Sequence, residues 1–402
     1  MTSTTAREAG LDAQLSKREL EVWGTNVHLR PEELDPREVW WRDRYQQLHI
    51  RGHRLRARYS PEWVPSWTTS NKNWEDCEDG KRLEVWVLFF FFTTDSHKFA
   101  SQYGQVIDAT RISDGKVVTL KRINKTEHPY EVDIGLYFSS KALASLPANH
   151  CVPIYDVFTL DDDENITIMV MPLFRPYTNP RFDTVGEVVE CFRQLFEGLQ
   201  FMHKHRVAHR DCMHRNLMLD PTRLYPKLFH PVERNMNEDC KGIAKHFTRT
   251  QRPPKYYFID FGISRQYDPA ITDPMEIPIW GGDKEVPEFQ NSHGPCDPFP
   301  TDVFYIGNAI RKDFILRKLG FEFMKPLVAD MTQPDPAKRP TMDEVVARFD
   351  DIRRGLSYRK LRSRVVDVDE DLYERVVRTA SHWKRRIEFV ARRVPAVPSV
   401  SP

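Results

Sequence analysis

The residues HRDCMHRN (209–216) place a carboxylate, an amide and several basic side chains next to one another. They follow a segment, 185–205, in which apolar residues recur every three or four positions and therefore predict a long helix. A carboxylate can accept a proton in catalysis, and amide and carboxylate oxygens suit a hard cation. The octet therefore predicts either a catalytic loop or a charged surface loop, and the rest of the chain decides between them.

Two further segments carry residues that suit the same chemistry. Lys121 lies inside VVTLKRI (117–123), whose β-branched and apolar residues predict a strand. In KYYFIDFGISR (255–265), a second predicted strand leads directly into Asp260-Phe261-Gly262. The three pieces follow one another as strand lysine, HRDxxxxN and DFG, and this order favours the catalytic loop.

This order resembles the signature of the protein kinase superfamily. Val286-Pro287-Glu288 resembles the motif that ends a kinase activation segment, and TDVFYIGN (301–308) resembles the start of the central buried helix, with Asp302 at the buried aspartate. DPAKRPTMDEV (335–345) resembles the late arginine segment. The resemblance, which covers about 103–350, implies that Arg339 pairs with Glu288.

Several segments also resemble uncharacterised kinase-domain proteins of mushroom-forming fungi. They include EVWWRDRYQQLHIRG (38–52), NHCVPIYDVF (149–158) and GGDKEVPEF (281–289). This second resemblance extends over about 38–365 and implies a kinase fold that binds ATP, with no established substrate.

The pattern of elements agrees with an α+β, bilobal kinase-like fold that has a β-rich N-lobe and a mainly helical C-lobe. A hairpin is predicted over 103–125 with its turn at 113–115, and a strand pair over 152–160 and 165–174. The expected regions are an N-terminal extension (1–80, partly disordered, one helix), an N-lobe (81–175), a C-lobe (176–358) with an insertion (221–255), and a C-terminal tail (359–402).

The extension should contain a helix that begins after Asp35, because Asp35 can cap it and Pro36 suits its first turn. Gly52 should end it. Arginines cluster around this helix and the stretch after it. We interpret them as a solvated face whose arginines pair with acids elsewhere, in preference to a nucleic-acid patch.

The resemblance implies a role for the lysine and its partner. Phosphoryl transfer requires neutralised phosphate charge and a nucleophile held in line. Lys121 would hold the α- and β-phosphates of ATP, and Glu131 would position Lys121. Glu127 and Asp133 remain alternatives to Glu131, because the intervening helix must be short.

The resemblance also assigns the predicted catalytic loop. Asp211 would orient the substrate hydroxyl and accept its proton, while Asn216 and Asp260 would bind Mg²⁺. Met171 would guard the back of the adenine pocket. The predicted nucleotide contacts are Gly104, Val106, Lys121, Glu131, Met171, Pro172, Phe174, Met218 and Asp260.

The chain departs from the kinase pattern at the glycine-rich loop. With Gly104 as the third glycine, Phe99 and Ser101 stand where the first two belong, and the backbone loses close approach to phosphate. The usual hydroxyl residue before the VPE motif is also missing. Tyr267 and Thr272 are weak candidates for regulatory phosphorylation.

Two segments fit the pattern poorly. The insertion 221–255 separates Asn216 from Asp260, and we expect a passive surface loop rather than a binding surface. The apolar segment 85–102 is either a buried strand or the product of a retained intron, and the sequence favours neither. The run VWVLFFFF (85–92) within it is far shorter than the ~20 residues that span a bilayer.

Composition excludes some functional classes. The formal net charge is +1 and 29% of residues are charged, so no global field favours nucleic acid or an anionic membrane. The 6 cysteines form no CxxC pair, which suits a reducing compartment. The polar N-terminus carries no secretory signal. We expect a soluble intracellular protein of the cytoplasm or nucleus, with no membrane partner. The sequence does not predict its oligomeric state.

The sequence thus predicts an ATP- and Mg²⁺-dependent protein kinase acting on a protein hydroxyl, with serine/threonine or tyrosine specificity left open. A pseudokinase scaffold is the first alternative, favoured by the degenerate glycine loop. A small-molecule kinase is the second, and a DNA-binding role based on the arginines ranks lowest.

Overall fold

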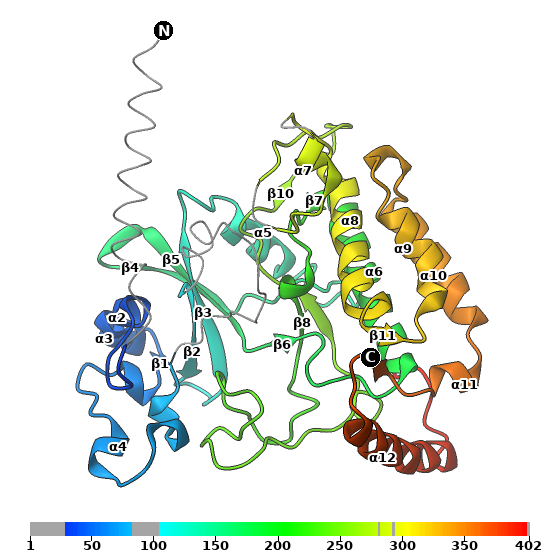
Figure 1. Ribbon diagram of the computed structural model, residues 1–402. Coiled ribbons are helices and arrows are strands. Elements are labelled where there is room, and N and C mark those ends of the chain that lie inside the picture. The colour runs from blue at the N-terminus through cyan, green and yellow to red at the C-terminus, as the bar shows by residue number, and fades with distance from the viewer. Residues whose placement is uncertain (1–28, 83–103, 280–281, 292–293, 400–402) are drawn as a thin grey trace. The chain divides into compact units, whose positions relative to one another are not determined.

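The computed structural model describes residues 29–82, 104–279, 282–291 and 294–399 (Figure 1). The chain divides into two compact units. Unit 1 draws on Met1–Ile123, Phe158–Leu173 and Lys227–Ala244, and unit 2 on Asn124–Val157, Phe174–Pro226 and Lys245–Pro402. The predictions for 85–102, Phe99 and Ser101 lie outside the described residues.

Unit 1 is built on a five-stranded sheet with the strand order β1-β2-β3-β5-β4. The strands are β1 (His53–Arg54), β2 (Val106–Arg111), β3 (Val117–Asn124), β4 (Asp156–Leu160) and β5 (Asp163–Pro172). β2 and β3 pair antiparallel with Val106 opposite Lys121. Gly115 supplies the left-handed residue of their turn, with φ of +71°. The predicted hairpin is confirmed.

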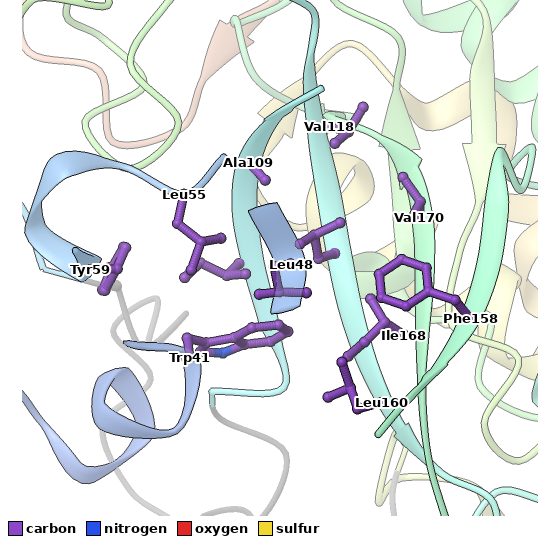
Figure 2. Close-up of a cluster of buried hydrophobic side chains, with 12 residues drawn as sticks. Trp41, Leu48, Leu55, Tyr59, Ala109, Val118, Phe158, Leu160, Ile168 and Val170 are labelled. Carbon is purple, nitrogen blue, oxygen red and sulfur yellow. The ribbon is translucent and has the colours of Figure 1, made fainter. Parts of the chain in front are cut away.

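The N-terminal extension covers this sheet with its own apolar residues. Figure 2 shows the shared core, in which Trp41, Leu48, Leu55 and Tyr59 from the extension lie with the sheet residues Ala109, Val118, Phe158, Leu160, Ile168 and Val170. These extension residues are almost completely buried. Burial of such large apolar side chains contributes about 1.5–3 kcal/mol each, so the extension is an integral part of unit 1.

Two consecutive helices, α2 (Pro36–Asp43) and α3 (Tyr45–Ile50), stand where the sequence predicted a single helix between Asp35 and Gly52. The predicted start is confirmed, because the Asp35 side chain accepts the Arg37 amide and Glu38 completes a capping box. The helix breaks at Arg44, whose φ and ψ of −104° and 9° are not helical. Short turns follow: η1 (Ala57–Tyr59), α4 (Ser66–Thr69), η2 (Trp74–Asp76) and η3 (Glu78–Gly80).

Two arginines of the extension are buried ion-pair partners. Arg58 donates to Glu38 at 3.0 Å, with both side chains at most 1% exposed. Arg56 donates to Asp108 of β2 at 3.1 Å and to Glu78 at 3.3 Å. The predicted pairing with acids is therefore confirmed, but the solvated position is wrong for these two. Arg58 is buried within the extension, and Arg56 links the extension to the sheet through Asp108.

Unit 2 is mainly helical among its described residues (Figure 1). Its helices are α5 (Glu131–Phe138), α6 (Val185–Lys204), α7 (Pro287–Asn291), α8 (Pro298–Ile310), α9 (Lys325–Met331), α10 (Met342–Gly355), α11 (Tyr358–Leu361) and α12 (Leu372–Ala391). The described residues of unit 2 also form three small sheets. The first has the strand order β6 (Arg175–Pro176), β8 (Leu217–Leu219) and β9 (Tyr256–Phe258), the second pairs β7 (Val207–Ala208) with β10 (Arg265–Gln266), and the third pairs β11 (Lys318–Leu319) with β12 (Val366–Asp367).

Helix α6 forms where its apolar periodicity predicted it. Thr184 caps the helix, and Glu187 reaches back to the Thr184 backbone in a capping box. Most of its residues are buried, so it forms the centre of unit 2. It ends just before the β7 strand that leads into 209–216.

The insertion contributes buried residues to both units. In unit 1, Phe229 is fully buried and the ring of His230 lies 3.3 Å from the Glu78 carboxylate. In unit 2, Arg249 is buried and donates to the Tyr177 carbonyl at 2.9 Å. The prediction of a passive surface loop is wrong for these residues, because they make core and polar contacts inside each unit.

Over the described residues, no helix combines the length and the apolar character needed to cross a bilayer.

Candidate active site

The loop that carries Asp211 is held by a buried carboxylate, Asp302 of α8. Its two oxygens accept the backbone amides of His209 and Arg210, each at 2.7 Å. Arg210 has a φ of +66°, which is unfavourable for a side chain with a Cβ. The two hydrogen bonds that these amides donate to one buried carboxylate stabilise this conformation. The predicted buried aspartate is confirmed at Asp302, which is 0% exposed.

His209 connects the loop to the strand before Asp260. Its Nε2 lies 3.1 Å from the Ile259 carbonyl, and its Nδ1 accepts the Asp211 amide at 3.3 Å. Burial lowers the pKa of His209 and so favours the neutral ring. A neutral ring that donates from Nε2 and accepts at Nδ1 satisfies both contacts.

Asp211 and Asn216 lie side by side. The Asn216 amide nitrogen donates to Oδ2 and to the backbone carbonyl of Asp211, both at 2.8 Å. Oδ1 of Asp211 is buried and has no hydrogen-bond partner among the described residues. Because the Asn216 nitrogen is occupied, its amide oxygen is the side-chain atom that can bind a cation.

The Asp211 carboxylate is poised to hold a proton. Burial raises its pKa well above the ordinary range, and the neighbouring Asp260 carboxylate raises it further. The hydrogen bond from Asn216 and the charge of Arg215 oppose these effects. A carboxylate with a raised pKa and an uncommitted oxygen suits a general base.

Asp260 follows β9 with a φ of +67°. Its Oδ1 accepts the Gly262 amide at 3.3 Å. On Gly262, an added Cβ would lie 3.2 Å from Oδ1 of Asp260 and 3.3 Å from Oε2 of Glu131, the first residue of α5. Asp260 and Glu131 therefore both lie close to one tightly packed glycine.

His128 also contacts this glycine, and the sequence analysis missed it. Its Nδ1 lies 3.0 Å from the Gly262 carbonyl. Its place three residues before Glu131 is the only sequence signal that could have indicated it. Aromatic contacts fix the intervening Phe261, whose ring centroid is 6.1 Å from Phe138 of α5 and 5.6 Å from His209.

The predicted nucleotide contacts of unit 1 lie on its sheet. Lys121 is buried in β3, directly opposite Val106 at the start of β2. Met171 and Pro172 end β5. Phe174 and Met218 belong to unit 2, where Phe174 stacks on Tyr257 with ring centroids 4.6 Å apart and Met218 pairs with Pro176.

Gly104 precedes β2 with a φ of +97°. The Trp41 indole donates to its carbonyl at 2.9 Å. A Cβ on Gly104 would fall 2.6 to 2.8 Å from the side-chain carbons of Arg37, whose guanidinium is held by Asp35. The extension therefore packs directly on Gly104, a contact that the sequence did not predict.

The segment after DFG is bound to the loop that carries Asp211 through the buried Arg210. Its guanidinium donates to the carbonyls of Ile263 and Ile277, at 3.1 and 3.0 Å. It also lies 3.4 Å from the Glu276 carboxylate. Glu276 in turn exchanges two backbone hydrogen bonds with Cys296, both at 2.9 Å.

The predicted pairing of Arg339 with Glu288 is confirmed. The guanidinium donates to both carboxylate oxygens, at 2.8 and 2.7 Å. The Thr301 hydroxyl donates to the same carboxylate at 2.7 Å. Burial alone would raise the pKa of Glu288, but the bonds from Arg339 and Thr301 lower it below its ordinary value.

The residues fit a magnesium nucleotide in their chemistry. Mg²⁺ is bound in proteins by one or two carboxylates, together with phosphate oxygens and water. Unit 2 offers the Asp260 carboxylate and the Asn216 amide oxygen, both near Asp211. Over the described residues, no group of three or more His, Cys, Asp and Glu side chains could hold a metal alone.

Comparison with known proteins shows similarity to protein kinases, both in a family model and in individual relatives. Residues 101–276 match the family model of the protein kinase domain. The chain is 31% identical over 123 residues to NUAK family SNF1-like kinase 1 of Mus musculus, covering 29% of this chain and 18% of that protein. It is 33% identical over 132 residues to serine/threonine-protein kinase CAK1 of Saccharomyces cerevisiae, covering 32% and 27%.

A longer match of lower identity is cyclin-dependent kinase 7 of Dictyostelium discoideum, at 22% over 214 residues, or 51% of this chain and 50% of that protein. The chain therefore spans between 18% and 50% of the lengths of these three relatives. The particular resemblance to fungal proteins stays a prediction. The predicted bilobal α+β kinase fold is confirmed, and the matched domain and the kinase relatives together support assignment to the protein kinase superfamily.

Proposed function

We propose that this protein is an ATP- and Mg²⁺-dependent protein kinase that transfers the γ-phosphate to a protein hydroxyl. The observation that carries the proposal is the arrangement of Asp211, whose one carboxylate oxygen accepts from Asn216 while the other is buried without a hydrogen-bond partner among the described residues. Asp211 would accept the proton of the substrate hydroxyl, and Asn216 would hold the carboxylate in place.

In this proposal, Asp260 and the amide oxygen of Asn216 would bind Mg²⁺, which neutralises charge on the phosphates. Lys121 would hold the α- and β-phosphates, with Glu131 as its partner. Gly104, Val106, Met171, Pro172, Phe174 and Met218 would surround the nucleotide. One relative is named a serine/threonine-protein kinase, so serine and threonine acceptors are the first to test.

A pseudokinase is the second candidate, favoured by the packing of Arg37 on Gly104. A backbone closely covered by a side chain has less freedom to approach phosphate. A small-molecule kinase is less well supported, because the Glu288–Arg339 pair belongs to the part of the resemblance that implies protein docking. We further propose an intracellular location, in the cytoplasm or nucleus.

The first experiment is thermal unfolding of the purified chain with and without Mg·ATP, followed by measurement of ADP release. The proposal expects stabilisation that Lys121→Ala and Asp260→Ala abolish. Lys116→Ala is the matched control for the lysine, since its side chain is 73% exposed in the turn of the same hairpin. Asp343→Ala, 68% exposed, is the control for the aspartate.

The outcomes separate the candidates. Stabilisation by Mg·ATP with ADP release and phosphate transfer to serine- and threonine-containing peptides supports a protein kinase. Binding with no transfer to any protein or peptide, or no binding by a folded chain, contradicts it and supports a pseudokinase. Transfer only to metabolites would support the small-molecule alternative.

A further inference from the structure

Helix α12 attaches to the rest of unit 2 through one polar face. Its Arg385 donates two hydrogen bonds to Asp183, at 2.9 and 2.8 Å, and His382 lies 3.3 Å from the same carboxylate. Arg378 donates to Glu370 at 2.7 Å. Of the α12 side chains, His382 and Phe389 are buried. The contact of this helix with its own unit is therefore mainly electrostatic.

The other face of α12 exposes large apolar side chains at regular intervals. The exposed fractions are 81% for Tyr373, 68% for Val376, 52% for Trp383, 66% for Ile387 and 47% for Val390. With the exposed Ala380, these positions alternate three and four residues apart along the whole helix. We call these six positions the α12 apolar stripe. Contiguous exposed apolar surface of this kind marks an interaction site more often than scattered single residues do.

The spacing of the stripe residues indicates the secondary structure of a partner that would bind there. A repeat of three and four residues is the pattern by which one helix packs its side chains between those of a second helix. Leu372 and Val377, which are 79% and 47% exposed, widen this apolar band over the first turns of the helix, whereas cations stand beside it at Trp383 and Ile387. The expected occupant is therefore another amphipathic helix.

The charges beside the stripe indicate which charges the partner helix should carry. The charged residues of α12 at the positions that flank it are Lys384 and Arg386, both cations. The Arg386 guanidinium lies over the Trp383 ring, 4.8 Å from its centroid. A second copy of α12 would offer no carboxylate to either of them, and like charges at these positions oppose pairing. Carboxylates on the partner would instead pair with them.

We propose that the α12 apolar stripe binds an amphipathic helix of another protein whose apolar positions are flanked by Asp or Glu. The binding helix covers Trp383 and Ile387 at its centre, where contacts to large side chains contribute most of the affinity. Its carboxylates set the orientation and the partner choice through Lys384 and Arg386. None of the residues of this surface is among those proposed for phosphoryl transfer, so the inference does not rest on that function.

The test uses the full chain and a labelled helical peptide of four heptads, with Leu at the a and d positions and Glu at the e and g positions. Fluorescence anisotropy should show saturable binding. A peptide of the same composition in scrambled order should not bind, because it has no apolar stripe. Trp383→Ser should weaken binding roughly tenfold or more, the size expected for a central aromatic contact. Ile50→Ser is the matched control, since Ile50 is 82% exposed on α3.

A charge exchange makes the test specific. Lys384→Glu combined with Arg386→Glu should weaken binding of the Glu peptide and strengthen binding of the same peptide with Lys at its e and g positions. Because all these side chains lie on the surface of α12, the circular dichroism spectrum and the thermal unfolding curve of the variant should match those of the wild type. A change in peptide binding can then be assigned to the exchanged charges.

Three results would overturn the proposal. The first is equal binding of the ordered and scrambled peptides. The second is a concentration-dependent dimer in light scattering that Trp383→Ser abolishes, which would make a second copy the occupant. The third is cosedimentation with phosphatidylserine vesicles that depends on Trp383, without peptide binding, which would make the stripe a membrane-surface element.

Discussion

Gly282 packs against the carboxylate of Asp211: a Cβ added to Gly282 would lie 2.4 Å from Oδ1 of Asp211 and 2.7 Å from the Tyr305 hydroxyl. No side chain fits at these distances without displacing one of the two groups. The segment before the VPE motif therefore reaches the proposed base as bare backbone. The Gly281-Gly282 pair was the sequence signal for this contact, and the sequence analysis did not use it.

Gly282→Ala should lower kcat by about 100-fold, because displacement of a catalytic group by ~1 Å has effects of that size. Thermal stability should change much less than activity, since the contact lies at the edge of the loop. Gly355→Ala is the control, because no atom lies within 4 Å of its added Cβ. Unchanged kcat in Gly282→Ala would show that Asp211 is not the base or that the contact is not maintained in solution.

Asp302→Asn should destabilise the chain and remove activity together. The carboxylate accepts two backbone amides at 2.7 Å, whereas an asparagine presents an NH₂ group to one of them. Leaving one buried amide without an acceptor costs about 1–3 kcal/mol, measured as the change in free energy of unfolding in urea. Asp330→Asn, on a half-exposed side chain, should be neutral. A fully active Asp302→Asn variant would contradict the role given to this carboxylate.

We expect the carboxylate of Glu276 to supply the negative charge that keeps the segment after DFG ordered, so that no phosphorylated residue is needed there. Its carboxylate is the acidic partner of the buried Arg210, which also binds two carbonyls of that segment. Phosphatase-treated protein should therefore be active, and Glu276→Gln should reduce activity about tenfold and speed proteolysis within 263–296. Tyr267→Phe and Thr272→Ala should keep activity. A chain that is active only after phosphorylation of Tyr267 or Thr272 would contradict this prediction.

The attachment of α12 should weaken in acid. Burial alone would raise the pKa of Asp183, but hydrogen bonds from His382 and Arg385 lower it from 3.8 to about 2. A carboxylate whose folded pKa is below its unfolded pKa stabilises the fold above about pH 4, and this stabilisation is lost as the pH falls toward 2. The shift corresponds to about 2 kcal/mol.

Urea unfolding between about pH 6 and about pH 3, compared with Asp183→Asn, measures this contribution. The variant should be less stable at the upper pH and should lose less stability on acidification. Asp351→Asn, whose side chain is 75% exposed, is the control. Parallel pH curves for the wild type and Asp183→Asn would exclude the proposed linkage.

Local features of the fold were predictable because their signals lie within a few residues. Asp35 and Pro36 indicated the start of α2, and the turn at 113–115 indicated the β2–β3 hairpin. The Asp302 position and the Glu288–Arg339 pair came from the motif resemblance and are confirmed. Each of these needed only a short motif or a cap.

The remaining features depend on contacts between distant residues. His230 and Glu78 are 152 positions apart. No local sequence signal indicates that Arg37 and Gly104 come into contact. The exposed face of α12 was not predicted either, because a helix that attaches through charge and leaves its apolar residues outside reverses the usual burial pattern.

The interleaving of the two units has a consequence for how the chain is made. A ribosome releases 124–157 and 174–226, which belong to unit 2, before it releases 227–244, the last part of unit 1. The N-terminal unit therefore cannot finish folding as its own stretch of nascent chain, unlike domains that mature one after another during translation. For the same reason, expression of residues 1–173 alone should give an incomplete unit that lacks Phe229 and the contact of His230 with Glu78.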